Sequence, residues 1–115
     1  MIQEIIDKIE YIRVKFDELG EVDHPAYDRA IKYINDLYDS DYDWPMPFVG
    51  SGCGYGVSLV WEIGETFLDI EIMPVDIASL AIYRIGDGKP VFINAEKLDQ
   101  IRMILNNSVP LDKQD

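Results

Sequence analysis

Three alternating aspartates in the stretch DSDYDWP are the first residues whose spacing could do chemistry. A D-x-D-x-D spacing begins the calcium loop of an EF-hand, in which alternate carboxylates converge on one ion. That loop also needs glycine at its sixth position and glutamate at its twelfth, where this sequence has Trp44 and Gly50. The pattern therefore excludes an EF-hand and leaves an irregular cation site as a weak alternative.

Two further interpretations of this stretch remain. A solvated helix end explains the charges without any function. A contact epitope is the alternative, because aromatic residues are enriched at binding hot spots and flanking acids would select a basic partner. The residues of that epitope would be Asp39, Asp41, Tyr42, Asp43 and Trp44.

A second group of carboxylates comprises Glu62, Asp69 and Glu71. Paired carboxylates can perform general acid–base chemistry when their pKa values are split. Asp69 and Glu71 are two positions apart, so they would project from the same face of a strand. The sequence supplies no oxyanion hole or substrate pocket beside them. Solvated acids on an open sheet face are therefore the simpler interpretation.

The single cysteine, Cys53, and the single histidine, His24, are candidates for nucleophilic catalysis. A reactive thiolate needs an electropositive neighbour, and no basic residue lies near Cys53 in the sequence. The surrounding GSGCGYG is rich in glycine, but a phosphate-binding loop opens a helix, whereas this segment precedes a predicted strand. We expect a connector whose glycines permit unusual backbone angles, and no cofactor.

The charge is strongly negative, with 22 acidic and 10 basic residues and a net charge of −12. No Lys, Arg or His lies between Lys32 and Arg84. Direct binding to nucleic acid is not expected, because phosphate contacts need clustered basic side chains. An acidic field can instead steer a basic partner, although it can also serve solubility alone. With no long apolar run and no signal-peptide pattern, we expect a cytoplasmic protein without a membrane segment.

Two helices are predicted at the N-terminal end of the chain. Apolar residues recur at steps of three and four over residues 2–19, up to Leu19, and Gly20 is a suitable C-terminal stop. Asp23 can cap a second helix that has Pro25 in its first turn and ends near Ser40. The short connection predicts an antiparallel helical hairpin.

Residues 57–63 and 66–72 alternate with period two and flank Gly64-Glu65, a two-residue hairpin turn. This turn predicts a register in which Ile63 pairs with Thr66 and Trp61 with Leu68. One face of the hairpin is then wholly apolar, and the other is mixed.

Two more strands are predicted at residues 78–85 and 90–93, joined by a turn at Asp87-Gly88, followed by a helix capped by Asn94. The fold class is α+β, with the element order α-α-β-β-β-β-α and a four-stranded antiparallel meander. A short edge strand near Phe48 is the alternative to that order. Residues 1–109 would form one domain, and residues 110–115 a polar tail.

The mixed outer face of this sheet is a second candidate contact surface. Beside its carboxylates it would present five apolar or aromatic side chains, and such a face suits a partner or a second copy of the chain. The alternative is that a helix or the glycine-rich loop covers it. The five side chains are Val60, Phe67, Tyr83, Ile85 and Phe92.

The segment from Pro47 to Ile72 carries the pattern P-x-V, a glycine-rich gap, G-V-x-L-x-W-E and L-x-I-E-I. It resembles a group of small uncharacterised prokaryotic and phage proteins, some of them encoded near toxin–antitoxin or mobile-element genes. The resemblance covers about a quarter of the chain. Other members have D-G-G before the strand, where this sequence has Gly54-Tyr55-Gly56. The resemblance implies a prokaryotic or phage origin and an interaction role.

Our leading hypothesis is a small acidic binding protein without catalysis. It would act as an inhibitor or antitoxin-like partner of a basic protein, or as a nucleic-acid mimic. A self-associating module that dimerises through the outer face, and a small hydrolase using Cys53 with His24 or the carboxylates, are the alternatives. The predicted partner-binding residues are Asp39, Asp41, Tyr42, Asp43, Trp44, Glu62, Phe67, Asp69, Glu71 and Tyr83.

Overall fold

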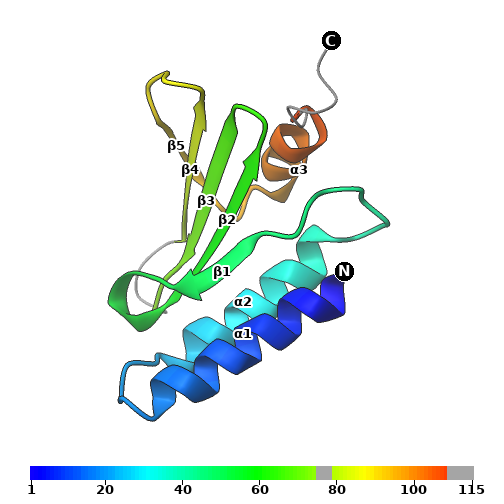
Figure 1. The fold of residues 1–115 in the computed structure, drawn as a ribbon. Coiled ribbons are helices and arrows are strands. Elements are labelled where there is room, and N and C mark those ends of the chain that lie inside the picture. Colours follow the sequence, from blue (N-terminus) through cyan, green and yellow to red (C-terminus); the bar gives the residue numbers. More distant parts are fainter. Residues whose placement is uncertain (75–78, 109–115) are drawn as a thin grey trace.

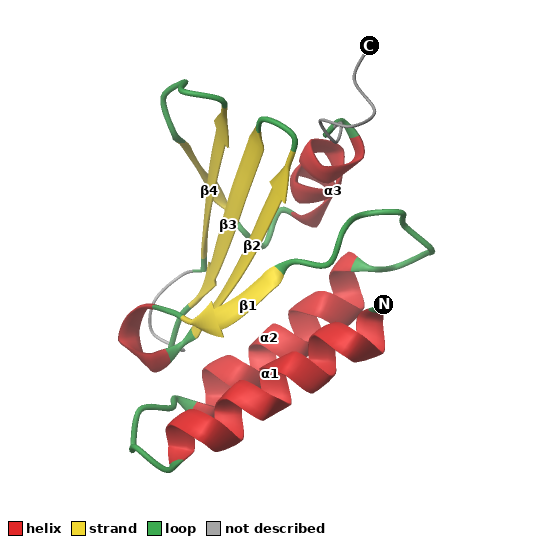
Figure 2. Cartoon of the chain, in the orientation of Figure 1, coloured by secondary structure: helices red, strands yellow, loops and turns green. Residues whose placement is uncertain are grey.

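The computed structural model describes residues 1–74 and 79–108 and shows three helices beside an antiparallel sheet of five strands (Figures 1 and 2). The strands follow the order β1-β2-β3-β4-β5, so each pairs with its neighbour in sequence. The α+β class is confirmed, but the predicted count of four strands is wrong. The fifth strand is β1, at the edge of the sheet. It corresponds to the short strand near Phe48 that was the alternative prediction. The bounds are α1 Ile2–Asp17, α2 His24–Leu37, β1 Phe48–Ser51, β2 Val57–Ile63, β3 Thr66–Ile72, β4 Leu80–Ile85, β5 Val91–Asn94 and α3 Leu98–Asn106, with a 3₁₀ turn at Cys53–Tyr55.

The helical hairpin forms as the sequence predicts, with one difference at its turn. Helix α1 ends at Asp17, and Gly20 takes a φ of 69°, which a residue without a Cβ adopts at no steric cost. Leu19 lies beyond the helix and is 65% exposed, so the predicted helix over residues 2–19 is two residues too long. At the start of α2, the carboxylate of Asp23 accepts a hydrogen bond from the backbone N–H of Ala26.

The β2–β3 hairpin has the predicted register. Ile63 pairs with Thr66, Trp61 with Leu68 and Val57 with Ile72, and Gly64 takes a positive φ in the turn. The two strands have the bounds expected from the alternation. The turn and the pattern together determined this pairing, because a slip of one residue would have turned the apolar set toward solvent.

The β4–β5 hairpin differs from the prediction in its turn. The N–H of Gly88 donates to the carbonyl of Ile85, and Gly86 has the positive φ, so the turn centres on Gly86–Asp87 and not on Asp87–Gly88. The predicted strand position 78 lies outside the described residues. Helix α3 begins at Leu98, later than a cap at Asn94 requires. Asn94 instead ends β5, and its side chain accepts from the N–H of Glu96 in the connecting turn.

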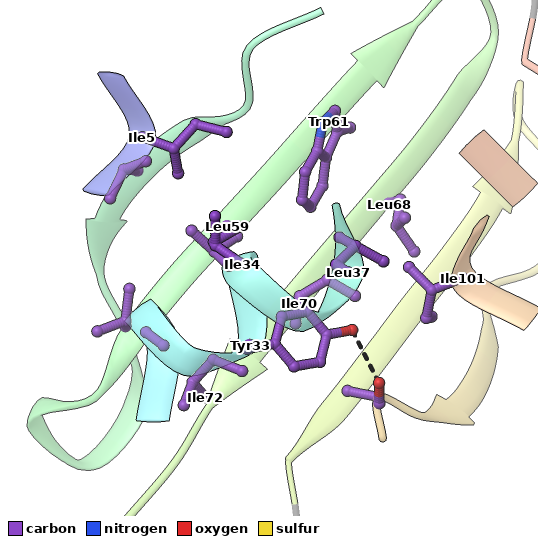
Figure 3. Close-up of a cluster of buried hydrophobic side chains, with 14 of the residues drawn as sticks. Ile5, Tyr33, Ile34, Leu37, Leu59, Trp61, Leu68, Ile70, Ile72 and Ile101 are labelled. Carbon is purple, nitrogen blue, oxygen red and sulfur yellow. Dashed lines mark hydrogen bonds between the residues drawn. The ribbon is translucent and has the colours of Figure 1, made fainter. Parts of the chain in front are cut away.

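The three helices and one face of the sheet enclose a single core. Figure 3 shows Trp61, Leu68 and Ile70 of the sheet facing Ile34 of α2 and Ile101 of α3. The phenol of Tyr33 donates to the carbonyl of Ala95 over 2.8 Å, which links α2 to the segment before α3 (Figure 3). We call the sheet face that packs against this core the inner face, and the opposite side of the same strands the outer face.

The helices within residues 1–74 and 79–108 are all too short or too polar to cross a membrane.

Candidate functional site

The outer face carries a row of side chains that runs across all five strands. The register aligns Phe48 of β1 with Val60, then with Asp69, Ile82 and finally Phe92 of β5. We call these five residues the outer row. Four of them are apolar or aromatic, and the central one is a carboxylate.

The outer row lies on the side of the sheet that the described helices leave uncovered, since all three helices pack into the inner core. Its two ends are open to solvent, with Phe48 71% exposed and Phe92 64% exposed. Val60, Asp69 and Ile82 are half-buried, as expected for central positions shielded by neighbouring side chains. Large apolar side chains exposed together in this way mark contact surfaces more often than single ones do.

The structure corrects two predicted members of this face. Tyr83 pairs with Leu68 and Ile85 with Thr66, so both lie on the inner side. Tyr83 packs against the core, whereas Ile85 is exposed at the hairpin tip. Glu62, Phe67, Asp69 and Glu71 do share the outer face, as predicted.

Asp69 and Glu71 form a pair of carboxyl groups on the outer side of β3. Burial, together with a hydrogen bond to Glu71 and the negative charge of Glu71, raises the pKa of Asp69 to about 7. The hydroxyl of Ser58 donates to Asp69 over 3.1 Å, which opposes that rise. Near neutral pH the Asp69 carboxyl is therefore close to the midpoint of its titration.

Glu71 also holds the glycine-rich turn. It is only 7% exposed, and its Oε1 accepts a hydrogen bond from the N–H of Cys53 over 3.3 Å. A Cβ at Gly52 would lie 2.8 Å from that oxygen, and one at Gly56 would lie 2.1 Å from the carbonyl oxygen of Ile72. The glycines are thus required for the close approach of this turn to β3, and Tyr55 has a positive φ within it. The turn therefore packs closely against β3, whereas the sequence led us to expect only a connector.

An open hollow of about 410 Å³ lies at the β1 end of the outer face. Three apolar side chains and one carboxylate line it: Met46, Phe48, Val60 and Glu62. The ring of Phe48 lies beside Gly50, where an added Cβ would be 3.0 Å from Cε1 of that ring. The absence of a side chain at Gly50 therefore helps to shape this end of the face.

The charges of the outer face are mainly negative. Glu62 is exposed on β2 and Asp69 is half-buried on β3, whereas Glu71 is only 7% exposed, and the register places Arg84 of β4 on the same side. The guanidinium of Arg84 lies 5.0 Å from the ring centroid of Phe67, a cation–π contact. This arrangement fits a partner whose own surface is apolar and basic.

In the segment from Asp39 to Trp44, Trp44 is not available as an exposed binding residue, and a contact epitope made of the other residues stays a prediction. Trp44 is only 5% exposed, and its indole N–H donates to Asn106 of α3 over 2.9 Å. Its ring stacks on Tyr42 at 4.0 Å, and the phenol of Tyr42 donates to Asp39. Asp39 also lies 3.5 Å from a guanidinium nitrogen of Arg102. The aromatic residues therefore fix this segment to the helices, while Asp41 and Asp43 remain exposed.

The metal alternative and the pairing of Cys53 with His24 receive no geometric support in the part of the chain that the structure describes. Its acidic, histidine and cysteine side chains form no group of three or more that could hold a metal ion. The imidazole of His24 lies 3.0 Å from Asp17, and no hydrogen bond within residues 1–74 and 79–108 joins His24 to Cys53.

Comparisons with protein-family models, curated proteins and solved structures find no match to this chain.

Sequence reasoning missed two members of the outer row, Phe48 and Ile82. Phe48 begins a strand of only four residues, too short for alternation to show a face. Ile82 stands between Ala81 and Tyr83, so both alternations of that strand contain apolar residues. Ile82 lies on the outer face because it pairs with Asp69, and the sequence alone does not show that pairing.

Proposed function

We propose that this protein is a small binding protein without catalysis, and that its outer sheet face docks a partner protein with a basic, apolar surface. The observation that supports this most is the outer row, five aligned side chains on a face that the described helices leave uncovered. In function the protein would be an inhibitor or an antitoxin-like partner.

Two physical arguments favour a basic partner over a neutral one. The net charge of −12 attracts a positively charged protein over a distance, which raises the rate of encounter. The outer face then supplies apolar contact area for affinity, and its carboxylates supply selection against acidic competitors.

Phe92 and Val91 offer a matched pair of variants to test this. They are neighbours on β5, both exposed, but Phe92 belongs to the outer row and Val91 lies on the opposite side. Tagged wild type, Phe92→Lys and Val91→Lys would be used as baits in lysate of the source organism, with quantitative mass spectrometry of the retained proteins.

We expect wild type and Val91→Lys to retain one basic protein, and Phe92→Lys to retain at least fivefold less of it. A lysine at position 92 would repel a basic partner and remove apolar contact area. A protein retained equally by all three baits would contradict docking through the outer face. So would the loss of that protein from Val91→Lys alone.

A further inference from the structure

The hollow lined by Met46, Phe48, Val60 and Glu62 indicates what the partner brings to the outer face. Three of its four lining residues are apolar, and the fourth, Glu62, is an exposed carboxylate. Within residues 1–74 and 79–108, the ion pairs of the structure do not involve Glu62. A side chain that fills this hollow would therefore contact both apolar surface and a negative charge.

Lysine and arginine have this combination of properties. Their methylene groups pack on apolar surface while the charged end stays near water or a counter-charge. An aromatic ring beside the stem adds a cation–π attraction, and Phe48 supplies one. Aliphatic side chains would fill the hollow equally well, but they would leave Glu62 without a partner.

We propose that a lysine or arginine side chain of the partner protein inserts into this hollow, with its methylene groups against Phe48 and Val60 and its charged end at Glu62. This inference rests on the proposed function, because it specifies the partner for the same outer face. The hollow adjoins the outer row, to which Phe48 and Val60 themselves belong. The inserted side chain would thus anchor one end of the contact.

A second copy of this chain fits the surface less well. Two outer faces placed together would bring the exposed Glu62 and the half-buried Asp69 of each copy into one interface. Arg84 is the basic residue that the register puts on this face, and it already lies over Phe67. Like charges brought together in an interface are destabilising, so the charge pattern favours a different, basic protein.

The test uses hexylammonium ion as a probe that has the charge of lysine on a somewhat longer alkyl chain, and hexanol as its neutral match. Each is titrated into isotopically labelled full-length protein, and amide and methyl NMR shifts are followed. We expect hexylammonium to shift Met46 and Val60 and to bind more tightly than hexanol. Glu62→Gln should weaken hexylammonium binding by about two- to fivefold, the range of an exposed ion pair, and leave hexanol unchanged.

Glu65→Gln is the matched control, because it removes the same charge from the β2–β3 turn, outside the hollow. It should change the affinity for hexylammonium by less than Glu62→Gln does. The inference is wrong if hexylammonium and hexanol bind equally, if both substitutions have the same effect, or if the shifts gather only around Asp41 and Asp43.

These outcomes separate the inference from the proposed function. One outcome is that hexylammonium does not bind in the hollow, but a partner is still lost from Phe92→Lys and retained by Val91→Lys. In that case the outer face binds the partner through other contacts. If the protein sediments alone as a dimer that Phe92→Lys converts to a monomer, a second copy occupies the face and the inference is overturned.

Discussion

The inner and outer faces of the sheet are built from alternating residues of the same strands, yet they differ in almost every property. The inner face of β2 and β3 presents Trp61, Leu68 and Ile70, each at most 1% exposed. The outer face presents Val60, Asp69 and Glu62 at neighbouring positions. The three helices cover the first face, and in the described part of the chain they leave the second uncovered. The comparison teaches that stability resides on one side of this sheet, which leaves the other side available for binding.

The largest effect expected from this comparison is on stability. Trp61→Ala should lower the free energy of unfolding by about 3–5 kcal/mol, because it removes a large buried side chain and leaves a cavity. Val60→Ala, next to it but on the outer face, should cost about 1 kcal/mol or less, since Val60 is half-buried. Urea unfolding of both variants measures the difference. Equal losses would mean that the outer face is packed against something as closely as the inner face.

The second effect concerns the carboxyl pair at the centre of the outer face. Folding raises the pKa of Asp69 from its ordinary value, about 4, to about 7, so the folded chain binds more protons than the unfolded chain between these values. The contribution of Asp69 to stability therefore declines as the pH rises from about 4 to about 7, and stays low above that. Asn at this position cannot ionise and can still accept the hydrogen bond from Ser58.

Asp69→Asn should therefore leave the stability at pH 4 nearly unchanged and raise it at pH 8 by about 1–2 kcal/mol, a figure reduced for solvent screening because Asp69 is only partly buried. Urea unfolding of wild type and variant at the two pH values tests this. A difference between the proteins that does not depend on pH would show that Asp69 titrates normally.

The smallest expected effect provides a control for binding. Phe92→Lys and Val91→Lys should each change the free energy of unfolding by no more than about 0.5 kcal/mol, because both side chains are largely exposed on an edge strand. Their thermal unfolding midpoints, measured by circular dichroism, should match that of wild type. A large loss for Phe92→Lys would mean that Phe92 stabilises the fold, and its effect on a partner would then need another explanation.

The parts of the fold that could be predicted are those where a turn and an alternation agree. The β2–β3 register follows from Gly64-Glu65 and from the apolar positions together, and both point to the same pairing. Strand β4 has no such support. It is joined to β3 by a longer connection, and Leu80, Ala81, Ile82 and Tyr83 are apolar or aromatic on both faces. Its alternation could not decide which side Tyr83 would take.

The same limit explains the segment that contains Trp44. An aromatic residue between aspartates and prolines shows no period, so the sequence could not indicate whether it is exposed or buried. Its burial depends on Tyr42 and on Asn106, which is 62 positions away in the chain. Of the predicted partner-binding residues, those in the β2–β3 hairpin could be placed because local pairing decides their direction. Trp44 and Tyr83 could not, because contacts distant in sequence decide theirs.

The central claim, that the outer face is the contact surface, is tested most directly by cross-saturation NMR. The protein would be deuterated, with isoleucine methyl groups protonated, and bound to the protonated protein retained by the wild-type bait. We predict that saturating the partner weakens the methyl signal of Ile82 on the outer face and leaves that of Ile70 on the inner face unchanged. Unchanged Ile82 together with weakened signals from Ile31 or Ile104 on the helices would contradict the account.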